Sequence, residues 1–178
     1  MRNNNGANLL DRKSPNGSDY YQTPAYATEL LYPYIDPNWV VWEPAAGLGA
    51  IVKAIVPRVK KVVVSEILDN GFDFLEDEIQ IEFDAIITNP PFSLKDEFLF
   101  RCYQIGKPFA LLMPLTALEG MYRHKAYRKY GIQLIIPNRR VNFIEWNGRK
   151  TDSYWFPVAW FTWGLLDRDL VFVEMENK

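Results

Sequence analysis

The sequence predicts an α/β fold with a doubly wound, mostly parallel sheet and an antiparallel strand at one edge. Short, continuously apolar runs alternate with segments of helical length, which is the pattern of parallel strands covered by helices on both faces. Asn147-Gly148 separates two late apolar runs and favours a hairpin turn, hence an antiparallel pair. The 178 residues, 48% of them hydrophobic, suit one core. We therefore predict a single domain over residues 20–178, preceded by a flexible, Asn-rich arm over residues 1–19.

The first predicted element is a helix in the segment YYQTPAYATELLYPYI. Thr23 is expected to cap this helix, with Pro24 at its first position. Its apolar residues recur at the spacing of one helical face: Ala27, Leu30, Leu31 and Tyr34. We therefore expect an amphipathic helix that packs against another element.

The later elements alternate along the chain. Strands are predicted at WVVWEP, KVVVSEI, FDAIITNP, FALLMPL, IQLIIP and VAWFTW, with a further short strand, third in order, just before Asp73. Helices are predicted at AIVKAIV, KDEFLFRCYQI and YRHKAYRKYG. Ser93 and Asp96 have the spacing of a capping box and are expected to open the second of these helices.

Acidic residues follow the ends of successive predicted strands. Glu43 ends the first strand and precedes Gly47 and Gly49, which permit a tight turn and the close approach of backbone amides to a ligand. Glu66 ends the second strand, 17 positions after Gly49. This is near the spacing of ~20 residues at which an acidic residue binds ribose hydroxyls. The pattern indicates a nucleotide-type ligand, and a plain structural turn is the alternative for the glycines.

Asp73-Phe74 follows the expected third strand and suits an adenine ring, because a carboxylate accepts from the amino group and a phenyl ring lies on the base. Core packing is the alternative role for Phe74. The sequence has no Gly-x-x-x-x-Gly-Lys-Ser/Thr loop and no third glycine at the dinucleotide spacing. The ligand is therefore expected to be an adenosine compound without a pyrophosphate.

The segment Asn89-Pro90-Pro91-Phe92 follows the fourth predicted strand, beside the same crevice. The Asn89 side-chain oxygen and the Pro90 carbonyl can both accept hydrogen bonds from one NH₂ group. Such acceptors would localise the lone pair of a weakly nucleophilic amine and direct it at an electrophile, with rigid prolines holding them in place. Phe92 would stack on the ring that carries the amine. A proline-terminated strand without chemistry is the alternative.

These residues together resemble the S-adenosylmethionine-dependent amino-methyltransferases, especially the DNA adenine methyltransferases of the Asn-Pro-Pro-Phe type. The resemblance covers residues 20–164 and implies a Rossmann-like methyltransferase fold with S-adenosyl-L-methionine as cofactor and transfer to the 6-amino group of a flipped adenine. It implies the catalytic residues Asn89, Pro90, Pro91 and Phe92. It implies that the cofactor is bound by Tyr21, Thr23, Pro24, Glu43, Pro44, Ala45, Gly47, Gly49, Glu66, Ile67, Asp73, Phe74 and Asn89.

Many such enzymes carry an added target-recognition domain, and this chain is expected to have none. Cations gather instead between Met121 and Lys150, where eight Lys and Arg residues face one acid. Phosphate contacts are predicted for these, and the SYWFP stretch resembles a second wall for the flipped base. The predicted nucleic-acid-binding residues are Arg123, Lys125, Arg128, Arg139, Arg140, Arg149, Lys150, Trp155 and Phe156. A solvated basic surface and core packing of the rings are the alternatives.

Composition excludes several classes of protein. The apolar stretches are too short to span a membrane and the start lacks the apolar region of a signal peptide, so a cytoplasmic protein is expected. A single cysteine and a single histidine do not make a zinc site, and we expect no metal. Cys102 is expected to pack in the core of a helix, and His124 to be solvated or to face phosphate.

Three other substrates or roles stay open on this sequence. Asn-Pro-Pro-Phe also occurs in enzymes that methylate adenine or guanine amino groups of RNA, and Asn-Pro-Pro-Tyr in enzymes that methylate protein glutamine. A nucleic-acid-binding module that keeps the fold without turnover is the third. The oligomeric state and the recognition sequence have no signal in the chain.

Overall fold

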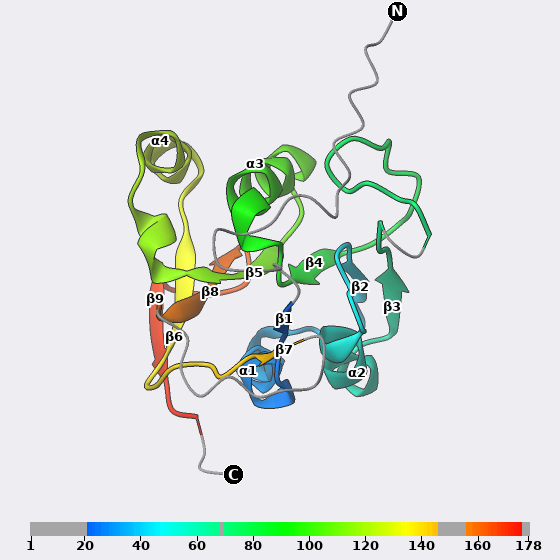
Figure 1. Ribbon diagram of the computed structural model, residues 1–178, viewed down its shortest axis with the longest axis horizontal. Helices are drawn as coiled ribbons and strands as arrows, with labels where there is room; N and C mark the ends of the chain where they lie inside the picture. The colour runs from blue at the N-terminus through cyan, green and yellow to red at the C-terminus, as the bar shows by residue number, and fades with distance from the viewer. Residues whose placement is uncertain (1–20, 68–69, 146–155, 176–178) are drawn as a thin grey trace, which may run out of the picture.

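The protein is described by a computed structural model that covers residues 21–67, 70–145 and 156–175. The predicted class is confirmed: a seven-stranded, mostly parallel sheet lies between helices, in the order β3-β2-β4-β5-β8-β6-β9 (Figure 1). Its strands are β2 (Val40–Glu43), β3 (Lys61–Val64), β4 (Ala85–Thr88), β5 (Phe109–Pro114), β6 (Gln133–Pro137), β8 (Val158–Trp163) and β9 (Leu170–Val173). This is the Rossmann-like methyltransferase arrangement.

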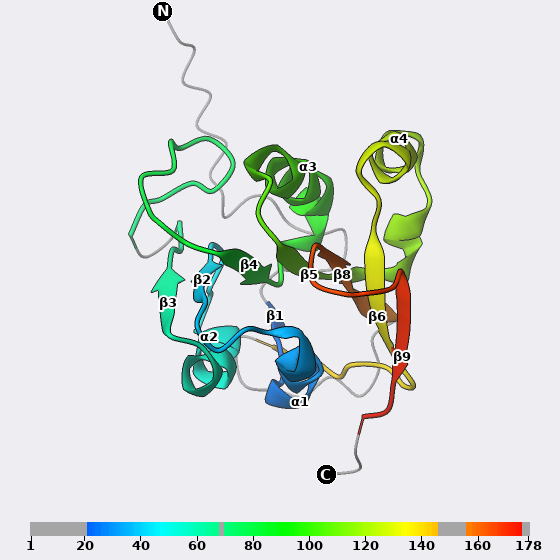
Figure 2. The ribbon, with the colours of Figure 1, turned by 180° about the vertical axis from the view of Figure 1, so that it is seen from behind.

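Helices cover both faces of the sheet, as the continuous apolar strands require. The helices are α1 (Ala25–Glu29), α2 (Ala50–Ile55), α3 (Lys95–Ile105) and α4 (Met121–Tyr130), with short 3₁₀ turns η2 (Tyr32–Tyr34), η3 (Val56–Arg58), η4 (Phe92–Leu94) and η5 (Leu115–Leu118). Helices α3 and α4 lie on one face and α1 and α2 on the other (Figures 1 and 2). None of these helices is long and apolar enough to cross a bilayer.

Strand β5 contributes side chains to the hydrophobic cores on both faces of the sheet. Ala110 and Leu112 belong to the core cluster on the side of α1 and α2. Phe109, Leu111 and Met113 belong to the cluster on the side of α3 and α4. Successive strand residues point to opposite faces, so a run that is apolar at every position builds two cores at once.

The antiparallel strand is β8, near the end of the sheet that β9 closes. It pairs antiparallel with both β5 and β6, and β9 then pairs parallel with β6. The segment before Asn147-Gly148 was expected to pair with β8. Instead β7 (Ile144–Glu145) pairs antiparallel with β1 (Tyr21–Gln22), which brings the start of the described chain under the centre of the sheet. Asn147-Gly148 itself lies outside the described residues.

Three local predictions are wrong. Helix α1 ends at Glu29, and Pro24 rather than Thr23 is at its N-cap, without a side-chain cap. Helix α3 begins at Lys95 after a 3₁₀ turn in which the Leu94 amide bonds the Pro91 carbonyl at 2.8 Å, so Ser93 lies too early to cap it. Both helices begin without a hydrogen bond from a capping side chain.

The strand expected just before Asp73 is absent from the described residues. The side chains there accept local amides instead: Asn70 Oδ1 from the Phe72 amide at 3.2 Å, and Asp73 Oδ1 from the Leu75 amide at 2.9 Å. Asn and Asp stabilise turns in this way and offer the backbone an alternative to a strand ladder. Strand β3 is consequently the outermost strand at that side of the sheet.

Candidate functional site

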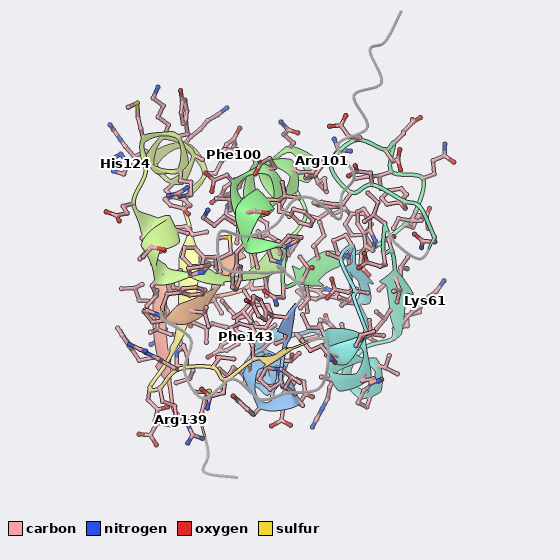
Figure 3. The ribbon with its side chains drawn as sticks, in the orientation of Figure 1. Lys61, Phe100, Arg101, His124, Arg139 and Phe143 are labelled. Carbon is pink, nitrogen blue, oxygen red and sulfur yellow. The ribbon has the colours of Figure 1, made fainter. Side chains whose placement is uncertain are left out.

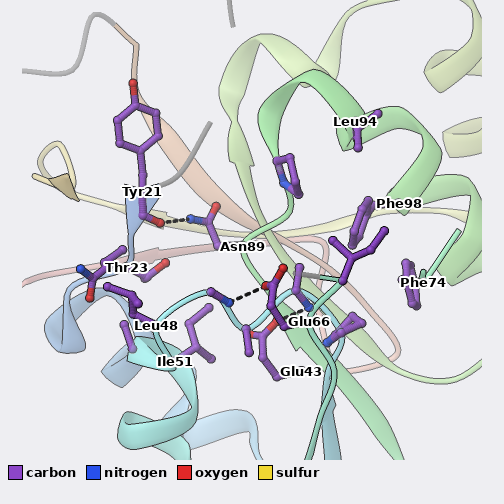
Figure 4. Close-up of a pocket in the computed structure, with 18 of the residues that line it drawn as sticks. Tyr21, Thr23, Glu43, Leu48, Ile51, Glu66, Phe74, Asn89, Leu94 and Phe98 are labelled. Carbon is purple, nitrogen blue, oxygen red and sulfur yellow. Dashed lines mark hydrogen bonds between the residues drawn. The ribbon is translucent and has the colours of Figure 1, made fainter. Parts of the chain in front are cut away.

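A pocket opens beyond the carboxyl ends of β2, β3 and β4, where doubly wound sheets bind ligands (Figure 4). It brings together most of the residues that the sequence assigns to a cofactor. Those that line it are Tyr21, Thr23, Glu43, Pro44, Ala45, Gly47, Glu66, Ile67, Asp73, Phe74 and Asn89. Pro24 and Gly49 are not among the lining residues and act as the N-cap residues of α1 and α2.

The turn after β2 is fixed by its glycines and by Glu66. Gly47 and Gly49 have φ values of 52° and 75°, a region that side-chain-bearing residues rarely adopt. The Gly47 amide donates to Glu66 Oε2 at 2.7 Å, which ties this turn to the end of the neighbouring β3 (Figure 4). The carboxylate that was predicted to bind a ligand therefore also shapes the loop that would hold it.

Glu43 is buried at the end of β2, with 1% of its surface exposed. Its Oε1 accepts the Ala45 amide at 3.0 Å. Burial raises the pKa of Glu43 to about 8, and the nearby Glu66 carboxylate adds to this rise. The pocket thus holds a carboxyl group that an incoming cation would stabilise in its charged form.

Asp73 and Phe74 lie in the segment between β3 and β4 and also line the pocket. Asp73 accepts the Leu75 amide and so holds the turn while lining the pocket. Phe74 is only 3% exposed: its ring stacks on Phe98 at a centroid distance of 4.8 Å and meets the edge of Trp42 at 5.2 Å. Its core role is thus established by the structure, and the part of the ring that lines the pocket is fixed by this packing.

Asn89 lies directly after β4 and has its two amide atoms in different situations. Its Nδ2 donates to the Tyr21 carbonyl at 3.3 Å, which fixes the orientation of the amide (Figure 4). Its Oδ1 is buried and accepts no hydrogen bond from the described residues, and the same holds for Thr23 Oγ1. A buried acceptor without a donor costs free energy, about 1–3 kcal/mol. Both atoms belong to residues that line the pocket.

The rest of the Asn-Pro-Pro-Phe loop is held by its surroundings. Pro91 lines the pocket, whereas Pro90 and Phe92 do not. The Phe92 ring meets the edges of Phe143 and Phe156, at centroid distances of 5.9 and 5.5 Å. Phe156, predicted as a wall for a base, therefore lies beside the ring predicted to stack on that base.

The predicted nucleic-acid-binding residues fall into three groups. Lys125 and Arg128 are exposed on α4, and Arg139 and Arg140 are exposed after β6. Arg123 lies inward and binds the carboxylate of Asp96. Arg149, Lys150 and Trp155 lie outside the described residues. Cys102 is buried in α3 as expected, and His124 is exposed on α4.

Sequence reasoning missed part of the lining. The missed residues are Ala46, Leu48, Ala50, Ile51, Phe72, Leu75, Ser93, Leu94 and Phe98. Most are direct neighbours of predicted residues, and this adjacency is the signal that would have found them. The pocket's described lining contains no basic residue and three carboxyl groups, so it suits a cationic ligand and disfavours phosphates.

No protein-family model and no curated protein matches the sequence. Solved structures do match. A protein described as an RNA methyltransferase from Pyrococcus horikoshii aligns with a TM-score of 0.52 and 15% identity, over 78% of this chain and 81% of that one. A dimethyladenosine transferase from Plasmodium falciparum aligns with a TM-score of 0.51 and 14% identity, over 80% of this chain and 62% of that one.

A third match is the modification subunit of a protein described as a type I restriction enzyme, from Vibrio vulnificus. It aligns with a TM-score of 0.54 and 14% identity over 95% of this chain. This chain spans about half, 49%, of that subunit. Likeness at these identities shows a shared fold.

Proposed function

We propose that the protein is an S-adenosylmethionine-dependent methyltransferase that modifies the exocyclic 6-amino group of adenine in DNA. The observation that carries the proposal is Asn89: its NH₂ is tethered to the Tyr21 carbonyl while its buried Oδ1 has no donor among the described residues. A side chain held in this way presents an acceptor to a pocket that would receive a donor. An amine is such a donor.

The residues present fit the proposed cofactor. Glu66 and Asp73 give the pocket negative character without a competing base, and the buried Glu43 carboxyl would be stabilised in its charged form by a sulfonium with an ammonium group. The orphan Thr23 Oγ1 lies in the segment proposed for the methionine end. Glu66 is proposed for the ribose hydroxyls, and Asp73 with Phe74 for the adenine ring. S-adenosyl-L-methionine, when bound, supplies an electrophilic methyl group.

The chain's own groups then prepare the amine. Asn89 Oδ1 and the Pro90 carbonyl accept hydrogen bonds from the two N–H groups of the amine, which localises the nitrogen lone pair and aims it toward the pocket. The proton that the product loses passes to solvent, since no described histidine or lysine lines the pocket. Phe92, braced by Phe143 and Phe156, provides a face on which the extruded base stacks.

DNA is the proposed substrate because the Asn-Pro-Pro-Phe resemblance and the restriction-enzyme modification subunit both point to it. An RNA adenine substrate is the second candidate, since the structural neighbours include a dimethyladenosine transferase. Both candidate reactions methylate the 6-amino group of adenine. They differ only in whether that adenine belongs to DNA or to RNA.

The test is the transfer of a labelled methyl group from S-adenosyl-L-methionine to duplex DNA, structured RNA and a protein extract in parallel, followed by digestion. We expect labelled N6-methyladenine from DNA. Label confined to RNA or to glutamine would keep the chemistry and overturn the substrate. Cofactor binding without label in any polymer would overturn the proposal in favour of a binding module.

Glu66→Ala is expected to weaken S-adenosyl-L-methionine binding at least about tenfold, because it removes the ribose acceptor and the partner of the Gly47 amide. Isothermal titration calorimetry measures this. Glu66→Gln keeps an oxygen for that amide and should lose less. The matched control is Glu78→Ala, which removes an exposed carboxylate after the turn at Asp73, and this variant should bind the cofactor like the wild type. Equal affinity of Glu66→Ala and Glu78→Ala would remove Glu66 from the site.

A further inference from the structure

Helix α4 and the η5 turn before it present apolar and cationic side chains together. Met121 and Tyr122 are 71% and 72% exposed, and Leu118 is 41% exposed. His124, Lys125, Arg128 and Lys129 are exposed on the same helix, which contains no acidic residue. Figure 3 shows this helix at the rim of the molecule, with His124 pointing outward. Large exposed apolar side chains at one place on a surface mark an interaction site.

Arg123 differs from the other cations of α4, because it points inward and attaches the helix to its neighbours. Its Nη1 donates to both carboxylate oxygens of Asp96, at 2.7 and 2.6 Å, and its Nε donates to the Ala117 carbonyl at 2.8 Å. Its Nη2 donates to the Glu119 carbonyl. Gly120 has a φ of 117°, which side-chain-bearing residues rarely adopt, and a Cβ there would lie 2.5 Å from Arg123 Nη2, so the guanidinium would have to shift. Arg123 therefore anchors the start of α4 to the start of α3.

This anchor fixes α4 relative to the reacting loop. Asp96 lies in the first turn of α3, and the neighbouring Lys95 donates from Nζ to the Phe92 carbonyl at 3.3 Å. Turn η5 follows β5, the parallel neighbour of β4, so both segments leave the sheet at the same edge. The start of α4, with Met121 and Tyr122, thus lies at the same end of the molecule as Asn89, and the helix then runs back toward Trp163, whose indole donates to the Tyr130 carbonyl at 2.8 Å.

The chemistry of the surface fits nucleic acid. Lys125 Nζ lies 5.8 Å from the Tyr122 ring centroid, and Lys129 Nζ lies 4.6 Å from that of Tyr130. Aromatic rings interleaved with cations bind unstacked bases by their faces and phosphates by charge. Glu119 precedes the helix in the sequence, and the Asp96 carboxylate is paired with Arg123.

We propose that α4 is a docking surface for a DNA strand, in which Met121 and Tyr122 contact unstacked bases while Lys125, Arg128 and Lys129 contact phosphates. This inference rests on the proposed function, because it names how the substrate of that site is held. It also assigns Arg123 a positioning role instead of a phosphate contact. The surface favours DNA whose bases are accessible, so single strands and mismatched duplexes should bind better than a perfect duplex.

The test is fluorescence anisotropy with a labelled single-stranded oligonucleotide and its duplex, over a series of salt concentrations. Tyr122→Ala is expected to weaken single-strand binding about tenfold, as loss of one stacking contact does, with the salt dependence unchanged. Lys125→Ala combined with Arg128→Ala should instead make the slope of log affinity against log salt concentration less negative, by about 0.7 for each phosphate contact that is lost. Phe172→Ala is the matched control, since Phe172 is a 75% exposed aromatic on β9, outside this surface.

Equal affinity of Tyr122→Ala and Phe172→Ala for the single strand would overturn the proposal. Thermal unfolding confirms that each variant is folded. The two proposals fail separately. If the wild type methylates DNA but the α4 variants bind it normally, the docking surface is wrong and the enzyme stands. If the variants lose DNA binding but the wild type transfers no methyl group, the surface stands and the enzyme is wrong.

Discussion

Replacing Asn89 by alanine is expected to lower the rate of methyl transfer about 10²- to 10³-fold while cofactor affinity stays within about threefold. The substitution removes Oδ1, the buried acceptor that has no donor among the described residues, and leaves the Glu43 and Glu66 carboxyl groups in place. Losses of this size are typical when one preorganised hydrogen-bonding group is removed from a transition state. Single-turnover kinetics with labelled cofactor measures the rate, and calorimetry measures the binding.

Two further variants separate the roles of the Asn89 amide. Asn89→Asp keeps an acceptor but loses the NH₂ that the Tyr21 carbonyl holds at 3.3 Å, so its rate should fall between those of the wild type and Asn89→Ala. Asn142→Ala, at an exposed position, is the matched control and should react like the wild type. A transfer rate for Asn89→Ala close to that of the control would show that the loop is only a proline-terminated strand.

Replacing Glu43 by glutamine is expected to stabilise the cofactor-free protein by a few kcal/mol at pH 8. Burial raises the pKa of Glu43 from 4.5 to about 8 in the folded state. One pH unit corresponds to about 1.4 kcal/mol, so ionisation of this buried carboxyl is a large cost that glutamine avoids. Urea unfolding without cofactor measures the difference.

The sign of the pH dependence follows from the proton count. Between pH 4.5 and about 8 the folded chain keeps the Glu43 proton that the unfolded chain releases. The wild type should therefore lose stability as pH rises through this window and level off above it. Burial also raises the pKa values of Cys102, Tyr103 and Tyr127, but from ordinary values of 9.0 and 10.0, so these groups titrate above the window. Parallel stability curves for the wild type and Glu43→Gln would contradict the expected burial cost.

The parts of the fold that the sequence predicted are those set by local pattern. Segments that are apolar at every position predicted the parallel strands. The glycines Gly47 and Gly49 predicted the tight turn, in which both have a positive φ. Strand β9, Leu170–Val173, was not predicted, because its four residues alternate between exposed and half-buried and it depends on β6 for pairing. The strand expected before Asp73 failed because Asn70 and Asp73 bond their own backbone.

The candidate site divides in the same way. Glu43, Glu66 and Asn89 were found because polar residues at strand ends have a sequence signal. The hydrogen-bond partner of the Asn89 side chain is the main-chain carbonyl of Tyr21, 68 residues away. Every residue has such a carbonyl, so the amino-acid sequence does not indicate which one is used. Arg123 looked like its cationic neighbours because its partner, Asp96, is 27 residues distant and is brought close only by the packing of α3 against α4.

The antiparallel pair of β1 and β7 makes the orientation of Asn89 depend on residues that are synthesised late. Tyr21, whose carbonyl orients Asn89, pairs with Glu145, and helix α1 behind it is held by Trp160, whose indole donates to the Ala27 carbonyl 133 residues earlier. At ~5–20 residues per second, the ribosome completes those partners roughly ten seconds after it has made Tyr21. A nascent chain that already contains the whole Asn-Pro-Pro-Phe loop therefore still lacks an oriented Asn89. The orientation of Asn89 therefore depends on contacts that span the described chain from Tyr21 to Trp160.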